Sequence, residues 1–236
     1  TFQSKGNKEE YVYATSWGVS TRLVGGVIMT HGDEKGLRLP PKIAPYQLVL
    51  VPIFKSDDDK ETIKKFVNPI LDELKKEQIR IHEDWRKESP GFKFNEWEMK
   101  GVPLRLEIGL RDIQNGKLTI ARRDSDQKVE IDKSNIVKRV PELLDEIQSA
   151  LFNQALEFRS LNTHTTKDYD EFKNIIKNNG GFVRCGWDGS EKTEKAIKDE
   201  TKATIRVIPF DENPKDLVCI YSGRPAKHEV IFAKAY

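Results

Sequence analysis

An uncharged run, "QLVLVPI" at residues 47–53, most constrains what this chain can fold into. Such a run is typical of a strand that is covered on both faces. The next stretch, "DDDKETIKKFVNPILDELKKE", begins with acidic residues, which suit a helix N-terminus. It carries a helical apolar stripe: Ile63, Phe66, Val67, Ile70, Leu71 and Leu74. Further strands are predicted in "IRIHEDW", "VPLRLEIGL" and "GKLTIARRDSDQKVEI". This alternation predicts an α/β domain with a parallel or mixed sheet flanked by helices.

The patterns before and after this region differ from it. Residues 1–45 contain a predicted strand, "EEYVYATSWG", then a short packed helix, "TRLVGGVIMTHGD", with Leu23, Val27 and Ile28 on one side, and then a proline-rich linker. Residues 134–162 form a long helix with Pro141 in its first turn and a buried stripe that reaches Phe158. For residues 163–236 the sequence pattern predicts two helices, "YDEFKNIIKNN" and "TEKAIKDETKA", and four strands: "FVRCGW", "TIRVIPF", "LVCIYS" and "EVIFAKAY". We therefore expect four parts: 1–45, 46–133, 134–162 and 163–236.

Composition restricts the function classes. The net charge is +2, so no global positive field favours nucleic acid, and any RNA contact needs a local patch. No apolar run approaches the roughly 20 residues of a membrane helix, and the N-terminus lacks a signal-peptide pattern. Two cysteines are too few for a disulfide scaffold. These features predict a cytoplasmic protein with reduced thiols and without membrane or DNA partners.

Three groups of residues allow both a structural and a functional interpretation. Arg22 could bridge a core element or clamp a phosphate with its planar guanidinium. The segment "SPGFKFNEWEMKGVPLRLEIG", residues 89–109, interleaves aromatic and charged residues, which fits either an ordinary helix or stacking of splayed RNA bases. A basic stretch could be a solvated face or follow a phosphate backbone: Lys117, Arg122, Arg123, Lys128, Lys133, Lys138 and Arg139.

Two cysteines and one histidine are the remaining candidates for site chemistry. Cys185 and Cys219 could be half of a zinc site, but a closed site needs four ligands and no paired-ligand spacing occurs. Two buried thiols are the favoured interpretation. His31 is expected to pack or to form a hydrogen bond beside Asp33.

Taken together, these stretches resemble one family. "TSWGVSTRLVGGVIMTHGDEKGLRLPPKIAPYQLVLVPI" looks like motif 3 of a class II aminoacyl-tRNA synthetase and its linker, in the form found in prolyl-tRNA synthetases of the archaeal and eukaryotic type. "GFKFNEWEMKGVPLRLEIG" is similar to the family's anticodon-binding signature. "IKDETKATIRVIPF" and the final "AKAY" resemble its C-terminal domain. The resemblance covers about residues 11–236.

The resemblance implies a fold and a set of site residues. It implies the edge of a class II catalytic domain, a Rossmann-like anticodon-binding domain with a mixed sheet, and a small α/β C-terminal domain. Arg22 would bind ATP phosphate as the catalytic residue, and Trp17, Gly18 and Ser20 would line the proline and adenylate pocket. The residues facing the anticodon would be Phe94, Glu98, Lys100 and Arg105. Tyr236 would be the family's terminal tyrosine.

The resemblance also implies a reaction. The parent enzyme would be a homodimer that activates proline with ATP and Mg²⁺ and transfers it to tRNA(Pro). The 236-residue chain alone is expected to be inactive, because motifs 1 and 2 would precede it. Many members carry four zinc-binding cysteines, but Thr193 and Ser222 occupy two of those positions here, so zinc is expected to be absent. The alternative is a non-catalytic tRNA-binding module. A nucleotide-binding α/β domain is disfavoured, since no Gly-rich loop follows "QLVLVPI".

Overall fold

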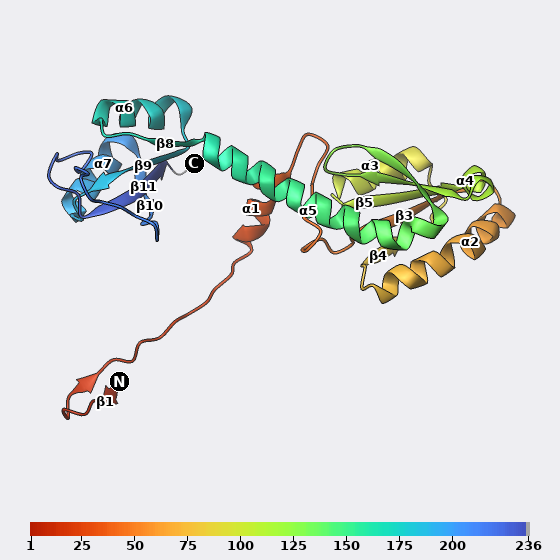
Figure 1. Ribbon diagram of the computed structural model, residues 1–236, viewed down its shortest axis with the longest axis horizontal. Coiled ribbons are helices and arrows are strands. Elements are labelled where there is room, and N and C mark those ends of the chain that lie inside the picture. The colour runs from red at the N-terminus through yellow and green to blue at the C-terminus, as the bar shows by residue number, and fades with distance from the viewer. Residues whose placement is uncertain (235–236) are drawn as a thin grey trace. The chain divides into compact units, whose positions relative to one another are not determined.

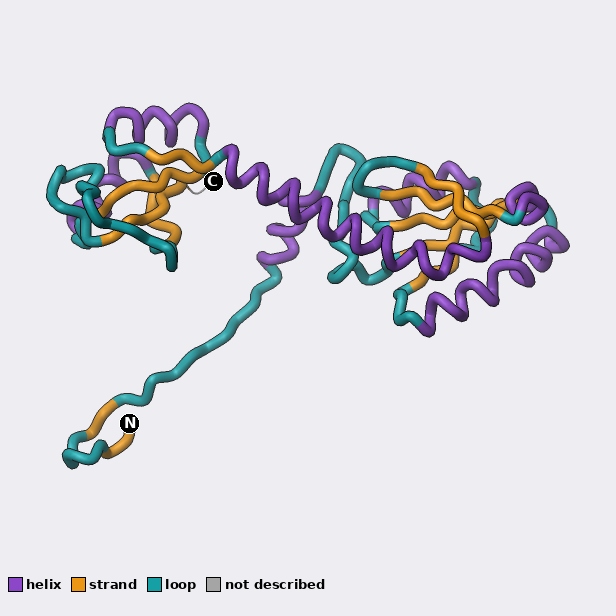
Figure 2. Tube along the Cα trace, in the orientation of Figure 1, coloured by secondary structure: helices purple, strands orange, loops and turns teal. Residues whose placement is uncertain are grey.

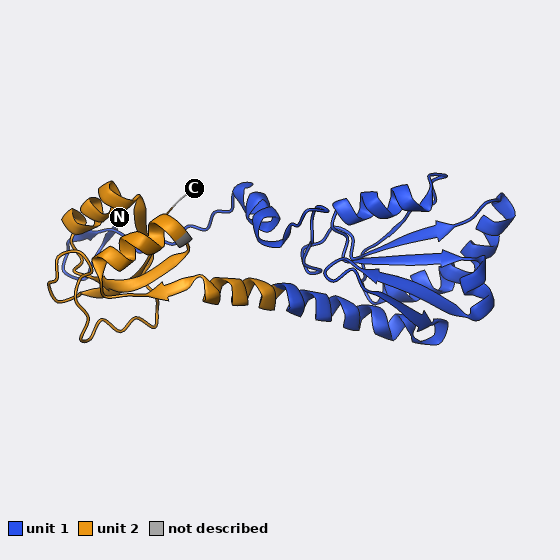
Figure 3. Cartoon of the chain, turned by 90° about the horizontal axis from the view of Figure 1, so that it is seen from above, with its two compact units in different colours: residues 1–151 blue, residues 152–236 orange. Residues whose placement is uncertain are grey.

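The computed structural model describes residues 1–234, with the side chain of residue 179 excepted. The chain divides into two compact units, the first comprising residues 1–151 and the second beginning at Phe152 (Figure 3). The last two positions of the predicted final strand, which include Tyr236, lie outside the described residues. No helix among the described residues is long and apolar enough to cross a membrane.

The first unit contains a five-stranded mixed sheet in the order β4-β3-β5-β6-β7 (Figure 1). β3 is parallel to both of its neighbours, whereas β6 and β7 join the far side in antiparallel register. The strands are β3 (Leu48–Ile53), β4 (Ile81–Glu83), β5 (Leu104–Gly109), β6 (Lys117–Arg122) and β7 (Lys128–Asp132). The prediction of a mixed α/β sheet is confirmed.

Helices cover both faces of this sheet, which explains the uncharged β3 run. α2 (Asp57–Lys76) and α5 (Ile136–Leu161) share one core with β3, β5 and β6, whereas α3 (Pro90–Met99) covers the other face. The short α4 (Leu110–Asn115) connects β5 to β6. The predicted α2 stripe is buried except at Phe66, and a capping box starts the helix: the Ser56 side chain accepts from the backbone N–H of Asp59.

The first 21 residues contain little regular structure (Figure 2). β1 (Phe2–Gln3) pairs with β2 (Glu9–Glu10), and α1 (Arg22–His31) is the predicted helix. The strand predicted over "EEYVYATSWG" is wrong beyond Glu10, because the following backbone meets no partner strand. α1 buries none of its residues, so the predicted packing through its apolar side is also absent among the described residues.

The second unit has its own four-stranded sheet, in the order β10-β11-β9-β8, and its own apolar core. Its elements are β8 (Thr163–Thr165), α6 (Tyr169–Asn174) with a π-helical continuation (Ile175–Asn179), β9 (Phe182–Trp187), α7 (Glu191–Thr201), β10 (Ala203–Val207) and β11 (His228–Lys234).

Three local predictions need correction. "LVCIYS" is not a strand, because Cys219 and Val218 make only isolated bridges within a series of turns. Pro141 lies inside α5 rather than in its first turn, since the helix already begins at Ile136. Phe158 is 70% exposed, because the helix has by then passed Leu151, its last buried residue.

Candidate nucleic-acid interface

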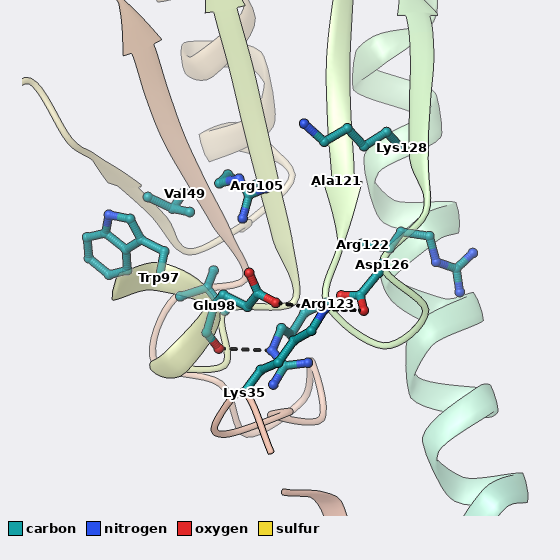
Figure 4. A pocket seen from close by; sticks show the side chains of 11 residues that line it. Lys35, Val49, Trp97, Glu98, Arg105, Ala121, Arg122, Arg123, Asp126 and Lys128 are labelled. Carbon is teal, nitrogen blue, oxygen red and sulfur yellow. Dashed lines mark hydrogen bonds and ion pairs between the residues drawn. The ribbon is translucent and has the colours of Figure 1, made fainter. Parts of the chain in front are cut away.

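A pocket of about 180 Å³ lies between the sheet of the first unit and the end of α3 (Figure 4). The strand register builds its floor: Val49, Arg105, Ala121 and Lys128 are successive partners across β3, β5, β6 and β7. Partners in register project from the same face of a sheet, so these four side chains form one row. Two apolar side chains, Val49 and Ala121, therefore alternate with two cations, Arg105 and Lys128, on the face of the sheet that α3 covers.

Arg105 is held in place by an acid on its own strand. Its Nε and Nη2 atoms donate to Glu107 Oε1 at 3.1 and 2.9 Å, because residues two apart on a strand share a face. The Lys128 ammonium lies 2.8 Å from the other oxygen of Glu107. Both cations also lie over the Phe94 ring, at 4.3 Å for the Arg105 guanidinium and 5.4 Å for the Lys128 ammonium. Phe94 and Arg105, two of the predicted RNA contacts, are thus in direct contact.

Glu98 provides one of the two carboxylates that line the pocket, and Asp126 provides the other. Glu98 lies one turn of α3 after Phe94, so the two side chains project in the same direction. The Lys35 ammonium lies 3.2 Å from Glu98 Oε1 and 2.6 Å from Asp126 Oδ2. The pocket therefore presents fixed guanidinium and ammonium donors beside a carboxylate acceptor, an arrangement that can meet the mixed donors and acceptors of a base edge.

Lys100 lies elsewhere. Its ammonium is 4.5 Å from the centre of the Trp97 ring and forms an ion pair with Glu96 at 2.6 Å. It lines a second, more apolar cavity of about 570 Å³ instead of the first. The lining of that cavity also includes Leu37, Leu39, Pro45, Tyr46, His82, Arg86 and Val102. Trp97 lines both cavities. Glu98 and Arg105 line the first pocket and Phe94 lies against Arg105, so three of the four predicted RNA contacts come together, whereas Lys100 lies beside the second cavity.

The two central arginines of the basic stretch are occupied by protein partners. Arg122 pairs with Asp124 at 2.9 Å and with Glu146 at 2.7 Å. Arg123 is only 6% exposed and makes a bidentate pair with Asp33 at 2.6 and 2.8 Å. The interpretation of these two residues as a phosphate track is wrong, because each guanidinium is paired with carboxylates of the protein itself.

Lys35 and Asp126 were missed by the sequence analysis. Lys35 lies 63 positions before Glu98, between the predicted short helix and the predicted linker, and no local pattern links two such positions. Asp126 has a positive φ of 56° in the turn between β6 and β7, a position at which Asp is often found. The "RRDSDQK" turn between two strands was the only available signal.

The residues predicted to contact ATP and proline form no pocket among the described residues. Trp17 is 92% exposed, and Gly18 and Ser20 lie in the same irregular stretch. Arg22 is exposed at the first position of α1. Their assigned roles stay predictions.

The cysteines are two free, buried thiols, as favoured above. Burial raises the pKa of Cys185 to about 12, which disfavours the thiolate form. Thr193 and Ser222 both donate to Asp188, at 2.7 and 2.8 Å. Over the described residues, no group of three His, Cys, Asp or Glu side chains could hold a metal ion.

Comparison with known proteins matches both units. Residues 47–143 match the family described as "Anticodon binding domain", and residues 169–236 match "Prolyl-tRNA synthetase, C-terminal". The chain is 46% identical to proteins named proline–tRNA ligase from Cytophaga hutchinsonii, Flavobacterium johnsoniae and Salinibacter ruber. Each alignment covers 100% of this chain and 48% of the relative, so the chain spans about half the length of the curated relatives it matches.

Proposed function

Because the chain belongs to the prolyl-tRNA synthetase family and corresponds to a C-terminal portion of its members, we propose that it supplies anticodon recognition to a proline–tRNA ligase. The longer protein would activate proline with ATP to prolyl-adenylate and transfer the prolyl group to tRNA(Pro). One observation carries this proposal: the anticodon-binding match, residues 47–143, contains every residue that lines the charged pocket except Lys35.

The pocket chemistry supports contact with bases rather than with phosphates alone. Phosphate repels a carboxylate, so Glu98 is useful beside RNA mainly as an acceptor from base amino or imino groups. Arg105 offers a planar set of donors, and its pairing with Glu107 at 2.9 Å orients it before RNA binds. Lys100 would contact RNA from the other side of Trp97, beside the second cavity.

We assign the remaining roles from the family. Arg22 would bind ATP phosphate, and Trp17, Gly18 and Ser20 would line the proline and adenylate pocket once the rest of the catalytic domain is present. Mg²⁺ would offset the charge of the triphosphate, but the described residues offer no ligand group for it. We propose that the parent is a cytoplasmic homodimer of the archaeal and eukaryotic type that holds no zinc.

The domain division follows the same proposal. Residues 1–45 would be the last part of a class II catalytic domain and its linker, and residues 46–133 the anticodon-binding domain. Residues 134–162 would be a connecting helix, and residues 163–236 the C-terminal domain. The exposed apolar side chains of α1 would then be covered by the preceding part of the longer protein.

The test is binding of the chain to cognate tRNA and to anticodon-substituted tRNA across a salt series. Glu98→Ala and Arg105→Ala should each reduce the preference for cognate tRNA by about 1–3 kcal/mol, the scale of a base contact in DNA readout carried over to RNA. The matched controls are Glu130→Ala and Arg111→Ala, which remove the same residue types at exposed positions outside the pocket.

We call the binding of cognate tRNA relative to anticodon-substituted tRNA the cognate-to-altered ratio. If this ratio is unchanged in both pocket variants, the pocket does not read the anticodon.

A second measurement distinguishes a ligase from a tRNA-binding module. Proline-dependent ATP–pyrophosphate exchange should be absent from the 236-residue chain and present in the longer gene product.

A further inference from the structure

The segment after α1, residues 33–39, lies directly along the end of α3, and we call it the strap. Leu37 N–H donates to Met99 O at 2.9 Å, and Leu39 N–H donates to Gly101 O at 3.1 Å. Gly36 has a φ of 130°, and a Cβ atom there would lie 2.6 Å from the Met99 backbone. The strap and α3 therefore touch backbone to backbone, which only glycine permits at this position.

One guanidinium joins the strap to the pocket. Arg123 binds both carboxylate oxygens of Asp33 in the strap, and its Nε donates to the Glu98 carbonyl oxygen at 2.9 Å. The hydrogen bonds from Arg123 lower the pKa of Asp33 to about 2, so the acid is ionised at neutral pH. Arg123 thus fixes the backbone of Glu98 relative to the strap.

A second strap residue holds the side chain of Glu98. The Lys35 ammonium lies 3.2 Å from the Glu98 carboxylate, and the backbone N–H of Lys35 donates to Asp33 at 2.9 Å. The Lys35 side chain is 53% exposed, and an exposed ion pair contributes little to folding stability. We therefore expect Lys35 to affect the orientation of the Glu98 carboxylate more than the stability of the fold.

We propose that Arg123 and Lys35 are positioning residues for base recognition, because together they fix the backbone and the carboxylate of Glu98. This inference rests on the proposed role of the pocket in reading the anticodon. It gives the strap a part in specificity, although Lys35 lies outside the matched anticodon-binding domain. Arg123 is only 6% exposed and directs three N–H groups to Asp33 and to the Glu98 carbonyl, so we infer that it acts through Glu98 and not through direct RNA contact.

The experiment measures the cognate-to-altered tRNA binding ratio of the chain with Arg123→Lys and Lys35→Met. Each should narrow the ratio by about three- to tenfold. Arg139→Lys is the matched control, since Arg139 pairs with Glu142 and Glu146 outside the pocket, and it should leave the ratio unchanged. Lys35→Arg should retain the ratio, because it keeps a cation beside Glu98.

A positioning role makes one prediction that a merely structural role does not. In a Glu98→Ala background, Arg123→Lys and Lys35→Met should have no further effect on the ratio, because the group they orient is gone. Ratios that stay unchanged in both single variants, while Glu98→Ala still narrows the ratio, would overturn this inference and leave the anticodon proposal standing. An unchanged ratio in Glu98→Ala and Arg105→Ala would overturn both. Lys35→Met keeps the test valid if Arg123→Lys fails to fold.

Discussion

Two tryptophans in the first unit show how differently the chain treats similar side chains. Trp17 is 92% exposed in a stretch without regular structure, whereas Trp97 is 5% exposed. The Trp97 indole N–H donates to Asp84 at 2.8 Å, and its ring lies 4.7 Å from that of His82. The same residue type is buried in one region and exposed in the other. Burial therefore depends on whether neighbouring elements supply contacts, and not on the residue type alone.

The contrast extends to whole elements. α1 has apolar side chains in helical register but buries none of them, whereas β5 buries Leu104, Leu106 and Ile108 completely. An isolated helix of this length is marginal in water without tertiary contacts. Under the proposed function, the missing contacts come from the part of the longer relatives that this chain does not span.

The largest effect should come from equal truncations in the two regions. Leu104→Ala should lower the free energy of unfolding of the first unit by about 2–5 kcal/mol, because it leaves a cavity in a core with no exposed surface. Leu23→Ala in α1, where the side chain is 60% exposed, should change it by less than about 0.5 kcal/mol. Denaturant unfolding of both variants tests the comparison, and equal losses would show that α1 is packed in solution.

For activity, in contrast to stability, we expect the exposed α1 to be sensitive to substitution. In the longer protein, Arg22→Ala should raise the barrier to adenylate formation by about 2–4 kcal/mol, as expected for loss of a charged phosphate contact. In the present chain it should leave the melting temperature unchanged, since Arg22 is exposed. ATP–pyrophosphate exchange measures the first effect, and an unchanged exchange rate would make Arg22 a residue without a phosphate role.

Sequence patterns were sufficient where one element determines its own environment. The β3 run and the α2 stripe were correctly predicted, because a strand covered on both faces and a one-sided helix impose different spacings. For "EEYVYATSWG" and "LVCIYS", the local pattern suited a strand, but a strand also needs a partner with free backbone groups. That partner is a property of the whole fold.

The candidate site was predictable only in part for the same reason. Glu98 and Arg105 lie in one recognisable segment, and the structure brings both to the pocket. Lys35 reaches that pocket because Gly36 in the strap and Gly101 after α3 permit a close backbone approach, and no spacing in the sequence encodes this contact. The arginine pair in "ARRD" suggested phosphate binding, but Arg123 instead meets Asp33, 90 positions earlier.

The smallest predicted effect concerns the ion pair between Asp33 of the strap and Arg123, which follows β6 of the sheet. Arg123 lowers the pKa of Asp33 from 3.8 to about 2, so the folded state holds the proton less tightly than the unfolded state. Asp33 therefore contributes stability above about pH 4, and this contribution is lost as the pH falls from 4 toward 2. The Asp33 side chain is 34% exposed, so screening should limit the effect to about 1 kcal/mol.

Asp33→Asn should remove this acid-dependent part of the unfolding free energy, whereas Glu34→Gln controls for the loss of one negative charge at an exposed neighbour. Denaturant unfolding of the first unit at pH 6, 4 and 3 is the measurement. If Asp33→Asn and the unchanged chain lose stability in parallel over this range, the Asp33–Arg123 pair does not form in solution. The strap would then be unpacked in solution, like residues 1–31, and would not be attached to the sheet. A flatter profile in Asp33→Asn alone would place the boundary between the two regions before Asp33, at the end of α1.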